Sequence, residues 1–384
     1  MNILFLSWND PRLHDSGGEQ RNHLIFRTLC EIGTTYTALP AMAGRTTLLD
    51  DSRIARVSTE HKFSPRWLAR NLTMRAIPEI ILSRSADPVW PTEWPSFDLV
   101  VVRHSTLASY WQPWKWAPTI LDLDDLPSEF LGTRTTGFRG PLANLLVRSW
   151  QSAVCRHCSR IWLAYSEQAT ALPASIPTDI LENIPFAPET AIYDESDPQL
   201  PYLFTVGALS HPPNYNGLER FLREVWPTLH AAFPDLRWKI AGRGCPPAIA
   251  AECAATPGVE MLGFAPDLAP LYRNALACIV PVATGSGTCI KVREALLWGR
   301  ACLGWPFAFR GIPTNAQIPT NGIFSCDTPD DFVAALRRLS PPSDRRPIQR
   351  AARSFALDRW SPDRFSSIIR SSIAALPSFA SPTP

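Results

Sequence analysis

The feature that most constrains the fold is the segment 275–298, where an apolar strand pattern, ALACIVPV, runs into a glycine-rich turn and then into a helix pattern. The turn and the helix start read GSGTCIKVRE over 285–294. Such a junction gathers unpaired backbone N–H groups and the positive end of the helix dipole. Lys291 adds a mobile positive charge, and Glu294 follows three residues later on the same helical face. The segment therefore predicts an anion site that suits a phosphate-bearing ligand with hydroxyl groups to be held.

Composition narrows the class of protein. A chain of 384 residues is long enough for two domains with real cores, and 45% hydrophobic and 19% charged residues are typical of a soluble globular protein. The net charge of +2 gives no electrostatic case for nucleic-acid binding. Nine cysteines without framework spacing indicate reduced thiols in the cytosol. Cys155 and Cys158 form a lone CxxC without a second ligand pair, so no metal site is predicted.

Membrane and export signals are weak. No apolar run approaches the ~20 residues of a membrane span, and the chain opens on a strand pattern instead of a signal peptide. We therefore expect a cytoplasmic protein, soluble or peripheral on the inner face of the membrane.

Strand and helix patterns alternate in two halves of the chain. The first half predicts a loop that runs into an amphipathic helix within 17–33, and strands at 2–8, 98–104, 118–125 and 160–166. The second predicts helices at 216–233, 247–255, 267–275 and 289–298, with strands at 202–209, 237–242, 259–264, 275–282 and 300–305. Runs of this kind form parallel sheets with helices on both faces and bind ligands at the carboxyl ends of the strands. The prediction is an α/β protein with two Rossmann-like domains whose parallel sheets face each other across a cleft.

Four segments, in order along the chain, resemble a known family. FTVGALSHPPNYNGLERFLREVWPTL (204–229) and GSGTCIKVREALLWGRACLG (285–304) are similar to its donor-domain motifs. SGGEQRNHLIFRTL (16–29) resembles its first glycine-rich loop, and YSEQATAL (165–172) with the later LENIPF resembles its approach to the linker. The chain thus looks like a GT-B glycosyltransferase of group 1, family 4, in a bacterial branch with a GSGT-x-IK-x-x-E donor loop.

The resemblance implies the activity. We expect transfer of a sugar from a nucleotide-diphosphate-sugar to a saccharide or lipid-linked acceptor in polysaccharide or glycoconjugate synthesis. It further implies a retaining reaction that needs no metal and no cofactor besides the donor substrate.

The domain boundaries follow from composition and from the resemblance. We expect an acceptor-side domain over 1–187 and a donor domain over 201–360. The stretch 188–200 is taken as the linker, because its surroundings are rich in proline and acidic residues and lack periodicity. In GT-B enzymes the final helix crosses back to the first domain, and 361–384 is assigned that role.

The donor site combines charge with close backbone approach. Lys291 and Arg243, the latter in a GRG turn after a strand, are expected to stabilise charge that develops on the leaving diphosphate. Glu294 matches the second glutamate of the family's pair, so the resemblance implies that it holds the ribose hydroxyls, for which a carboxylate is a good acceptor. The other residues expected to bind the donor are Gly207, His211, Asn214, Gly285, Ser286, Gly287 and Thr288.

Several positions depart from the family pattern. Ser286 stands where the family often has a glutamate that touches the donor sugar, so the identity of the sugar stays open. His211 and Asn214 stand where many relatives have an arginine and a lysine. Cys289 replaces a common arginine, which weakens the anion site.

In the first half, candidate residues follow the first strand pattern. Gly17 and Gly18 allow close approach of a ligand to the backbone, and Glu19 and Arg21 are expected to flank the cleft. An ordinary strand-to-helix turn explains the same residues.

Two further strand ends carry polar side chains. Asp124 and Asp125 end one strand pattern, and Asp125 or Asp124 is expected to orient an acceptor hydroxyl or to act as a weak base. N-capping of the next segment explains Asp125 as well. Arg103 and His104 end the preceding strand, where a histidine serves the cleft or a structural role.

The segment 63–85 bears on the acceptor. Its arginines alternate with tryptophan, leucine and isoleucine, as in helices that lie on an anionic membrane surface. Packing of the same helix on its own domain remains the alternative.

Two other functions stay open. A catalytically degenerate GT-B protein could serve as a binding or assembly partner, and a nucleotide-sugar epimerase shares the fold. A nicotinamide-dependent dehydrogenase is disfavoured, because no GxGxxG follows the first strand pattern.

Overall fold

The computed structural model describes residues 1–13, 17–41, 46–60, 87–129, 139–185 and 202–379. Contacts within the chain divide it into two compact units. The first unit is Met1–Asn183 with Pro362–Pro384, and the second is Ile184–Ser361. The expected linker 188–200 and the segment 63–85 lie outside the described residues.

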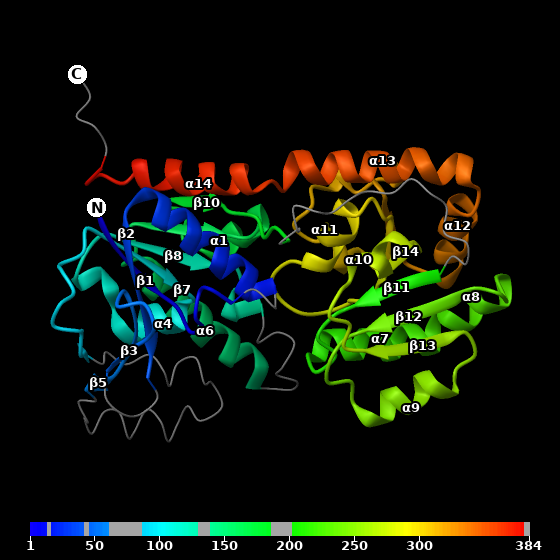
Figure 1. Ribbon diagram of the computed structural model, residues 1–384, viewed down its shortest axis with the longest axis horizontal. Helices are drawn as coiled ribbons and strands as arrows, with labels where there is room; N and C mark the ends of the chain where they lie inside the picture. The colour runs from blue at the N-terminus through cyan, green and yellow to red at the C-terminus, as the bar shows by residue number, and fades with distance from the viewer. Residues whose placement is uncertain (14–16, 42–45, 61–86, 130–138, 186–201, 380–384) are drawn as a thin grey trace. The chain divides into compact units, whose positions relative to one another are not determined.

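The first unit is built on an eight-stranded sheet (Figure 1). Its order is β10 (Thr178–Ile180), β9 (Arg160–Leu163), β8 (Thr119–Leu123), β7 (Leu99–Arg103), β1 (Asn2–Leu6), β2 (Thr34–Pro40), β4 (Ile54–Val57) and β3 (Thr47–Leu48). Neighbouring strands of this sheet are parallel except for β3 with β4, and a separate antiparallel pair joins β5 (Thr59–Glu60) to β6 (Asp87–Pro88). All five positions of β7 and of β8 are buried, as expected of strands covered on both faces.

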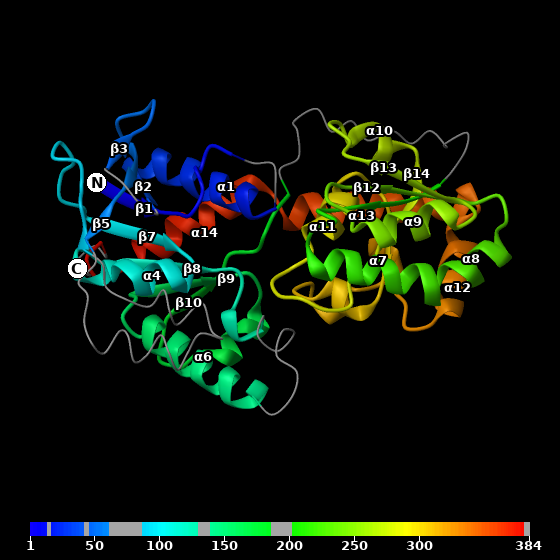
Figure 2. The ribbon, with the colours of Figure 1, turned by 90° about the horizontal axis from the view of Figure 1, so that it is seen from below.

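Helices cover both faces of this sheet. Figures 1 and 2 show α1 (Gly17–Ile32) and α14 (Pro362–Ala374) on one face, with α4 (Ser105–Trp111) and α6 (Arg139–Cys155) on the other. The indole of Trp162 in β9 donates to the hydroxyl of Ser372 at 2.7 Å, and Arg370 pairs with Glu31 at 2.7 Å. The C-terminal helix is therefore an integral layer of the first unit.

The second unit has a six-stranded parallel sheet. Its order is β13 (Val259–Gly263), β12 (Arg237–Ala241), β11 (Tyr202–Val206), β14 (Ala275–Val280), β15 (Cys302–Gly304) and β16 (Ile323–Ser325). From β11 the chain first builds the sheet outward in one direction and then returns to β14 on the other side. The carboxyl ends of β11 and β14 thus form a topological switch point, where α/β sheets bind ligands.

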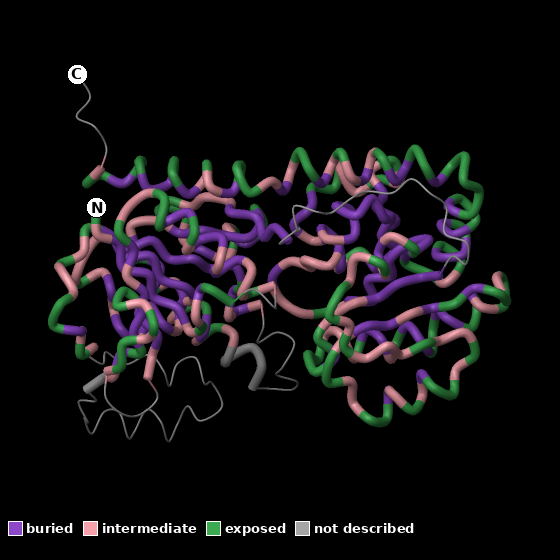
Figure 3. The backbone as a smooth tube through the Cα atoms, in the orientation of Figure 1, coloured by how far each residue is buried: buried purple, intermediate pink, exposed green. Residues whose placement is uncertain are grey.

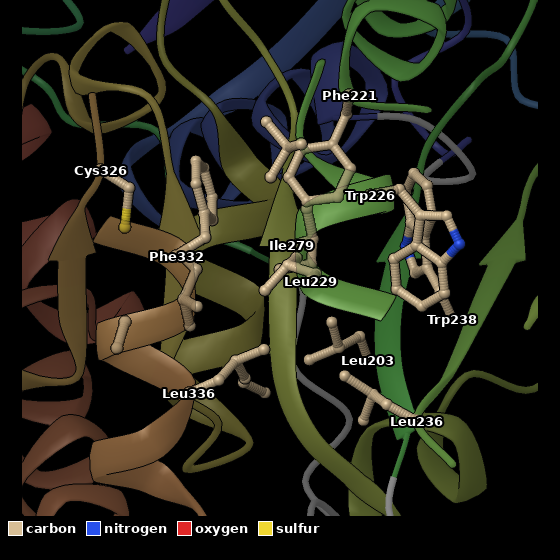
Figure 4. Packing of buried hydrophobic residues seen from close by; sticks show 14 of the residues in the cluster. Leu203, Phe221, Trp226, Leu229, Leu236, Trp238, Ile279, Cys326, Phe332 and Leu336 are labelled. Carbon is tan, nitrogen blue, oxygen red and sulfur yellow. The ribbon is translucent and has the colours of Figure 1, made fainter. Parts of the chain in front are cut away.

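Helices enclose this sheet as well. On one face lie α7 (Pro212–Glu224), α8 (Trp226–Ala232) and α9 (Pro247–Ala255), and on the other α10 (Ala269–Arg273), α11 (Ile290–Leu297) and α13 (Pro342–Arg359) (Figures 1 and 2). Helix α12 (Pro329–Leu339) packs against α8. Figure 4 shows aromatic side chains packed between α7, β12 and α12. The ring centroid of Phe221 lies 4.9 Å from that of Trp238 and 5.3 Å from that of Phe332. Figure 3 shows the strands as the most continuously buried parts of the backbone.

One predicted helix is divided in the structure. The pattern over 216–233 predicted a single helix, but α7 ends at Glu224 and α8 begins at Trp226. Pro227 follows at once, and a proline in a helix interior removes a hydrogen bond and clashes with the carbonyl four residues earlier. Pro227 therefore accounts for the break between the two helices at Val225.

Among the described residues, no helix combines the length and apolar character needed to span a membrane. The expected surface contact through 63–85 falls outside them.

Helix α7 approaches β14 so closely that Gly217 has no room for a side chain: a Cβ there would lie 1.6 Å from the carbonyl oxygen of Pro281. We predict that Gly217→Ala destabilises the second unit by about 1–3 kcal/mol, because overpacking outweighs the gain in helix propensity. Urea unfolding measures this. Gly18→Ala in α1, where a Cβ meets nothing within 4 Å, is the matched control and should leave stability unchanged or slightly higher. Equal responses of the two variants would contradict the prediction.

Candidate functional site

The glycine-rich loop lies at the carboxyl end of β14 and leads into α11. Gly285 has φ +135° and Gly287 has φ +61°, backbone conformations that residues with a side chain rarely adopt. Ser286 and Thr288 alternate with them. The loop therefore needs glycine at these two positions in order to turn from the strand into the helix.

Lys291, in the first turn of α11, reaches back to the end of β11. Its ammonium donates to the side-chain oxygen of Asn214 at 2.6 Å, and the amide of Asn214 donates to the carbonyl of Ala208 at 2.8 Å. A Cβ on Gly207 would stand 3.0 Å from the lysine nitrogen, so glycine makes room for it. The structure thus brings together Gly207, Asn214 and Lys291, which the sequence placed in one site from separate segments.

Burial changes the acid–base properties here. It lowers the pKa of Lys291, and the positive charge of Arg310 acts in the same direction, while Cys289 and Glu294 oppose it. Burial raises the pKa of Glu294, against the opposing effects of Tyr272 and Lys291. A cation and a carboxylate are thus held in a poorly solvated place, where their interactions with a ligand are strong.

Tyr272 is a site residue that the sequence reasoning missed. It lies in α10, fully buried, with its ring 5.1 Å from Phe204 and stacked on Trp298 at 6.0 Å. Burial, with the neighbouring Glu294 carboxylate, raises the pKa of its hydroxyl well above the ordinary value. Tyr272 and Lys291 line one small recess at β11 and β14. In the sequence Tyr272 is one more apolar position of a short helix, so no signal marked it.

Arg310 is the second residue that was missed. It follows the 3-10 helix η3 (Pro306–Phe309), and its guanidinium donates to the carbonyls of Ser286 and Gly287. It also donates to the carbonyl of Phe307 at 3.0 Å and lies over that ring at 4.0 Å. A positive charge therefore stands against the glycine-rich loop, close to Cys289.

Arg243 and His211 occupy exposed positions at neighbouring strand ends. The carbonyl of Arg243 accepts from the backbone N–H of Leu209 at 2.8 Å, which fixes the loop after β11. Its guanidinium lies 3.5 Å over the exposed ring of Phe264. His211 precedes α7 as its N-cap residue without a side-chain capping bond. Among the described residues, no hydrogen bond joins the Arg243 side chain to the glycine-rich loop.

In the first unit, two arginines and two aspartates form a buried ion network. Arg21 pairs with Asp122 at 2.5 Å, and Arg103 pairs with Asp122 at 3.1 Å and with Asp124 at 3.2 Å. Their side chains are between 0% and 7% exposed. Arg21, Arg103 and Asp124 are thus enclosed and neutralise one another, and their expected place at an acceptor cleft stays a prediction. Asp122, which the sequence reasoning did not single out, is their common centre.

Arg21 also holds the segment 181–183, which ends the N-terminal stretch of the first unit. Its guanidinium donates to the carbonyl of Leu181 at 2.6 Å and to the side-chain oxygen of Asn183 at 2.9 Å. Burial favours the neutral form of Asp124, but Arg103 and Arg21 hold its pKa well below the ordinary value. The stability that this carboxylate contributes is thus present above pH ~3.9 and is lost as the pH falls through the lowered value.

His104 is half-buried and Asp125 is exposed. His104 adopts φ +69°, rare for a residue with a side chain, and its backbone N–H donates to the carbonyl of Asp122 at 3.0 Å. Such strain costs about 1–3 kcal/mol and often occurs at functional sites. Burial and then Arg103 lower the pKa of His104, so its imidazole is neutral at pH 7. Asp125 is exposed next to the buried Asp124.

The glycines after β1 are less informative. Helix α1 begins at Gly17, Gly18 is exposed, and Glu19 lies in the first turn. Because a Cβ at Gly18 meets nothing within 4 Å, packing within the unit does not require glycine there. The preceding residues 14–16 lie outside the described part of the chain.

The ion network generates a stability prediction. Asp122→Asn should lower the free energy of unfolding by about 3–5 kcal/mol, because it leaves two buried guanidinium groups without their shared carboxylate. Chemical denaturation of the full chain measures this. The control is Asp50→Asn, since Asp50 pairs with Arg12 at 2.6 Å but is 75% exposed, and it should change little. A loss of stability no larger than that of the control would contradict the structural role.

Comparison with known proteins agrees with this geometry. Residues 200–340 match the model of the glycosyl transferases group 1 family. No curated protein matches the chain in sequence.

Solved structures resemble both units. Sucrose-phosphate synthase from Thermosynechococcus elongatus is 12% identical to this chain, with a TM-score of 0.66. The match covers 97% of this chain and 99% of that chain. Anabaena HepE in complex with UDP and glucose has 12% identity, 98% and 100% coverage, and a TM-score of 0.65. The trehalose-6-phosphate protein of E. coli, bound with UDP-2-fluoro glucose, has 11% identity, 98% and 99% coverage, and a TM-score of 0.64. At this identity the likeness shows the fold, which is of the GT-B type with two Rossmann-like domains. Residues 200–340, which contain the Lys291 site, thus form a group 1 glycosyltransferase domain, and this domain marks the chain as a glycosyltransferase enzyme.

Proposed function

We propose that the enzyme transfers a sugar from a nucleotide-diphosphate-sugar to a saccharide or lipid-linked acceptor, with retention of configuration and without a metal ion. The donor domain is 201–360, and the acceptor-side domain is 1–187 with the helix that follows residue 360. HepE was solved with UDP and glucose, which makes a UDP-sugar the first donor to test.

The observation that carries the proposal is the position of Lys291. Its ammonium lies beside the glycine-rich loop and is held at 2.6 Å by Asn214, next to a glycine that leaves the end of β11 open. When the bond to the sugar breaks, negative charge develops on the leaving diphosphate. A fixed ammonium and backbone N–H groups can stabilise that charge without reorganising at the moment of reaction.

Glu294 suits the nucleoside part of the donor. It follows Lys291 by one helical turn on α11, and the burial that raises its pKa makes an added hydrogen-bond donor favourable. Ribose hydroxyls are such donors. We therefore assign the diphosphate to Lys291 and the ribose to Glu294.

On the acceptor side, the accessible residues are the candidates. The neutral imidazole of His104 and the exposed carboxylate of Asp125 end neighbouring strands, and either can orient an acceptor hydroxyl. A lipid-linked acceptor, with a cytoplasmic enzyme that contacts the inner face of the membrane, is supported by the basic and apolar sequence of 63–85 alone.

The first test concerns Lys291. Lys291→Met should weaken binding of the nucleoside diphosphate about 10- to 100-fold, the range for loss of a charge-assisted hydrogen bond, and should slow donor hydrolysis further. In the wild type, affinity should fall as the pH rises through the lowered pKa of Lys291, because the ammonium loses its proton; the variant should lack this basic limb. Calorimetry with UDP, GDP and ADP from pH 6 to 10 measures both effects.

Lys115→Met is the control, since Lys115 is exposed in the 3-10 helix η1 (Pro113–Lys115) of the first unit. It should bind and turn over donor like the wild type. If the wild type binds no nucleoside diphosphate and hydrolyses no nucleotide-sugar, the transferase proposal fails, and a degenerate binding protein becomes the better interpretation. Release of an epimerised nucleotide-sugar instead of transfer would favour the epimerase.

The second test concerns Glu294. Glu294→Gln should lower the affinity for a ribonucleoside diphosphate about tenfold or more, since a hydrogen bond to a charged group contributes ~1.5–3 kcal/mol. Affinity for the matching 2′,3′-dideoxynucleoside diphosphate, already weak in the wild type, should not change further. A wild-type enzyme that binds the two ligands equally would contradict the ribose role of Glu294 and leave that of Lys291 intact.

A further inference from the structure

The side chain of Arg310 holds the glycine-rich loop from the side of η3. Its Nε donates to the carbonyl of Gly287, and Nη2 donates to the carbonyl of Ser286. A third bond from Nη1 to the carbonyl of Phe307, at 3.0 Å, and the ring of Phe307 at 4.0 Å fix the plane of the guanidinium. The forked geometry of arginine allows it to hold two consecutive carbonyls at once.

The direction of these carbonyls determines the direction of the loop's N–H groups. In a planar trans peptide, the C=O and the following N–H point in opposite directions. With the carbonyls of Ser286 and Gly287 turned toward Arg310, the N–H groups of Gly287 and Thr288 point away from it. Successive N–H groups on one side of a turn with alternating backbone conformation form an anion-binding concavity.

The charge of Arg310 is not neutralised by a carboxylate within the described part of the chain. No Asp or Glu that the structure describes pairs with it, whereas Arg21, Arg103 and Arg223 each pair with a carboxylate. Its effect is felt by Lys291, whose pKa it lowers. Two cations therefore flank a loop that contains no acidic residue between Gly285 and Cys289.

We infer that Arg310 is a positioning residue of the donor site, which orients the 286–288 peptides so that their N–H groups face the diphosphate and which adds positive charge beside it. This inference rests on the proposed function. It also accounts for a loop that carries Cys289 and no basic side chain of its own.

Two substitutions separate the loop geometry from the charge. Arg310→Gln removes the charge and the fork, while Arg310→Lys keeps the charge but cannot hold both carbonyls. The full-length variants are titrated with UDP, GDP and ADP, and the ligand that the wild type binds most tightly is compared with its nucleoside. We expect diphosphate affinity to fall at least tenfold in Arg310→Gln and less in Arg310→Lys, with nucleoside affinity unchanged in both. Arg338→Gln, on the exposed side of α12, is the control and should behave as the wild type.

The pH profile provides a readout that a purely structural role would not move. The charged or titratable groups that act on Lys291 are Cys289, Arg310 and Glu294. Loss of the Arg310 charge should therefore raise the pKa of Lys291 and shift the basic limb of diphosphate binding to higher pH in Arg310→Gln. In Arg310→Lys the limb should stay close to its wild-type position.

The outcomes are distinct. Suppose that the wild type and Lys291→Met behave as proposed, but Arg310→Gln binds the diphosphate within twofold of the wild type and loses affinity over the same basic pH range. The role of Arg310 is then overturned, and the proposed function stands. Equal losses of nucleoside and diphosphate affinity would also overturn it, since they would indicate general damage to the unit. A wild type that binds no diphosphate overturns the proposed function and this inference together.

Discussion

The second unit depends on the pairing of β11 with β14, because this pair places two loops from distant parts of the sequence at one edge of the sheet. Helix α7, which follows β11, approaches the loop after β14 so closely that glycine is needed at 217, and Gly207 leaves room for the ammonium of Lys291. The hydrogen bond from Lys291 to Asn214 then ties the two loops together. A half-buried ammonium placed at the switch point of a parallel sheet is well suited to an anionic ligand.

The two units differ in the groups that compensate their enclosed charges. In the first, arginines and aspartates neutralise one another at the ends of β7 and β8, and little of their side chains reaches solvent. In the second, Lys291 and Arg310 stand beside the glycine-rich loop with amide and carbonyl oxygens as their partners. The first arrangement stabilises a fold, whereas the second leaves positive charge that a ligand can compensate.

Much of the fold could be predicted from local patterns. The helix expected over 247–255 is α9 with the same bounds, and the strand and helix around the glycine-rich loop form as expected. Periodicity and glycine placement act over a few residues, so they are readable in the sequence. The prediction of a single helix over 216–233 was wrong. It followed the pattern of apolar residues, whereas Pro227 interrupts the helix near Val225.

The sequence by itself determined the order of strands and helices, the turn at Gly285 and Gly287, and the presence of Lys291 and Glu294 on one helical face. Only the tertiary structure decided which polar groups meet: Arg21 with Asp122, 101 residues away, and Arg310 with the carbonyl of Gly287, 23 residues earlier. It also decided that Arg21 and Arg103 are enclosed and that Tyr272 stands beside Glu294. The physical reason is that backbone geometry depends on neighbouring residues, whereas the partners and the solvation of a charge depend on how separate strands and helices pack.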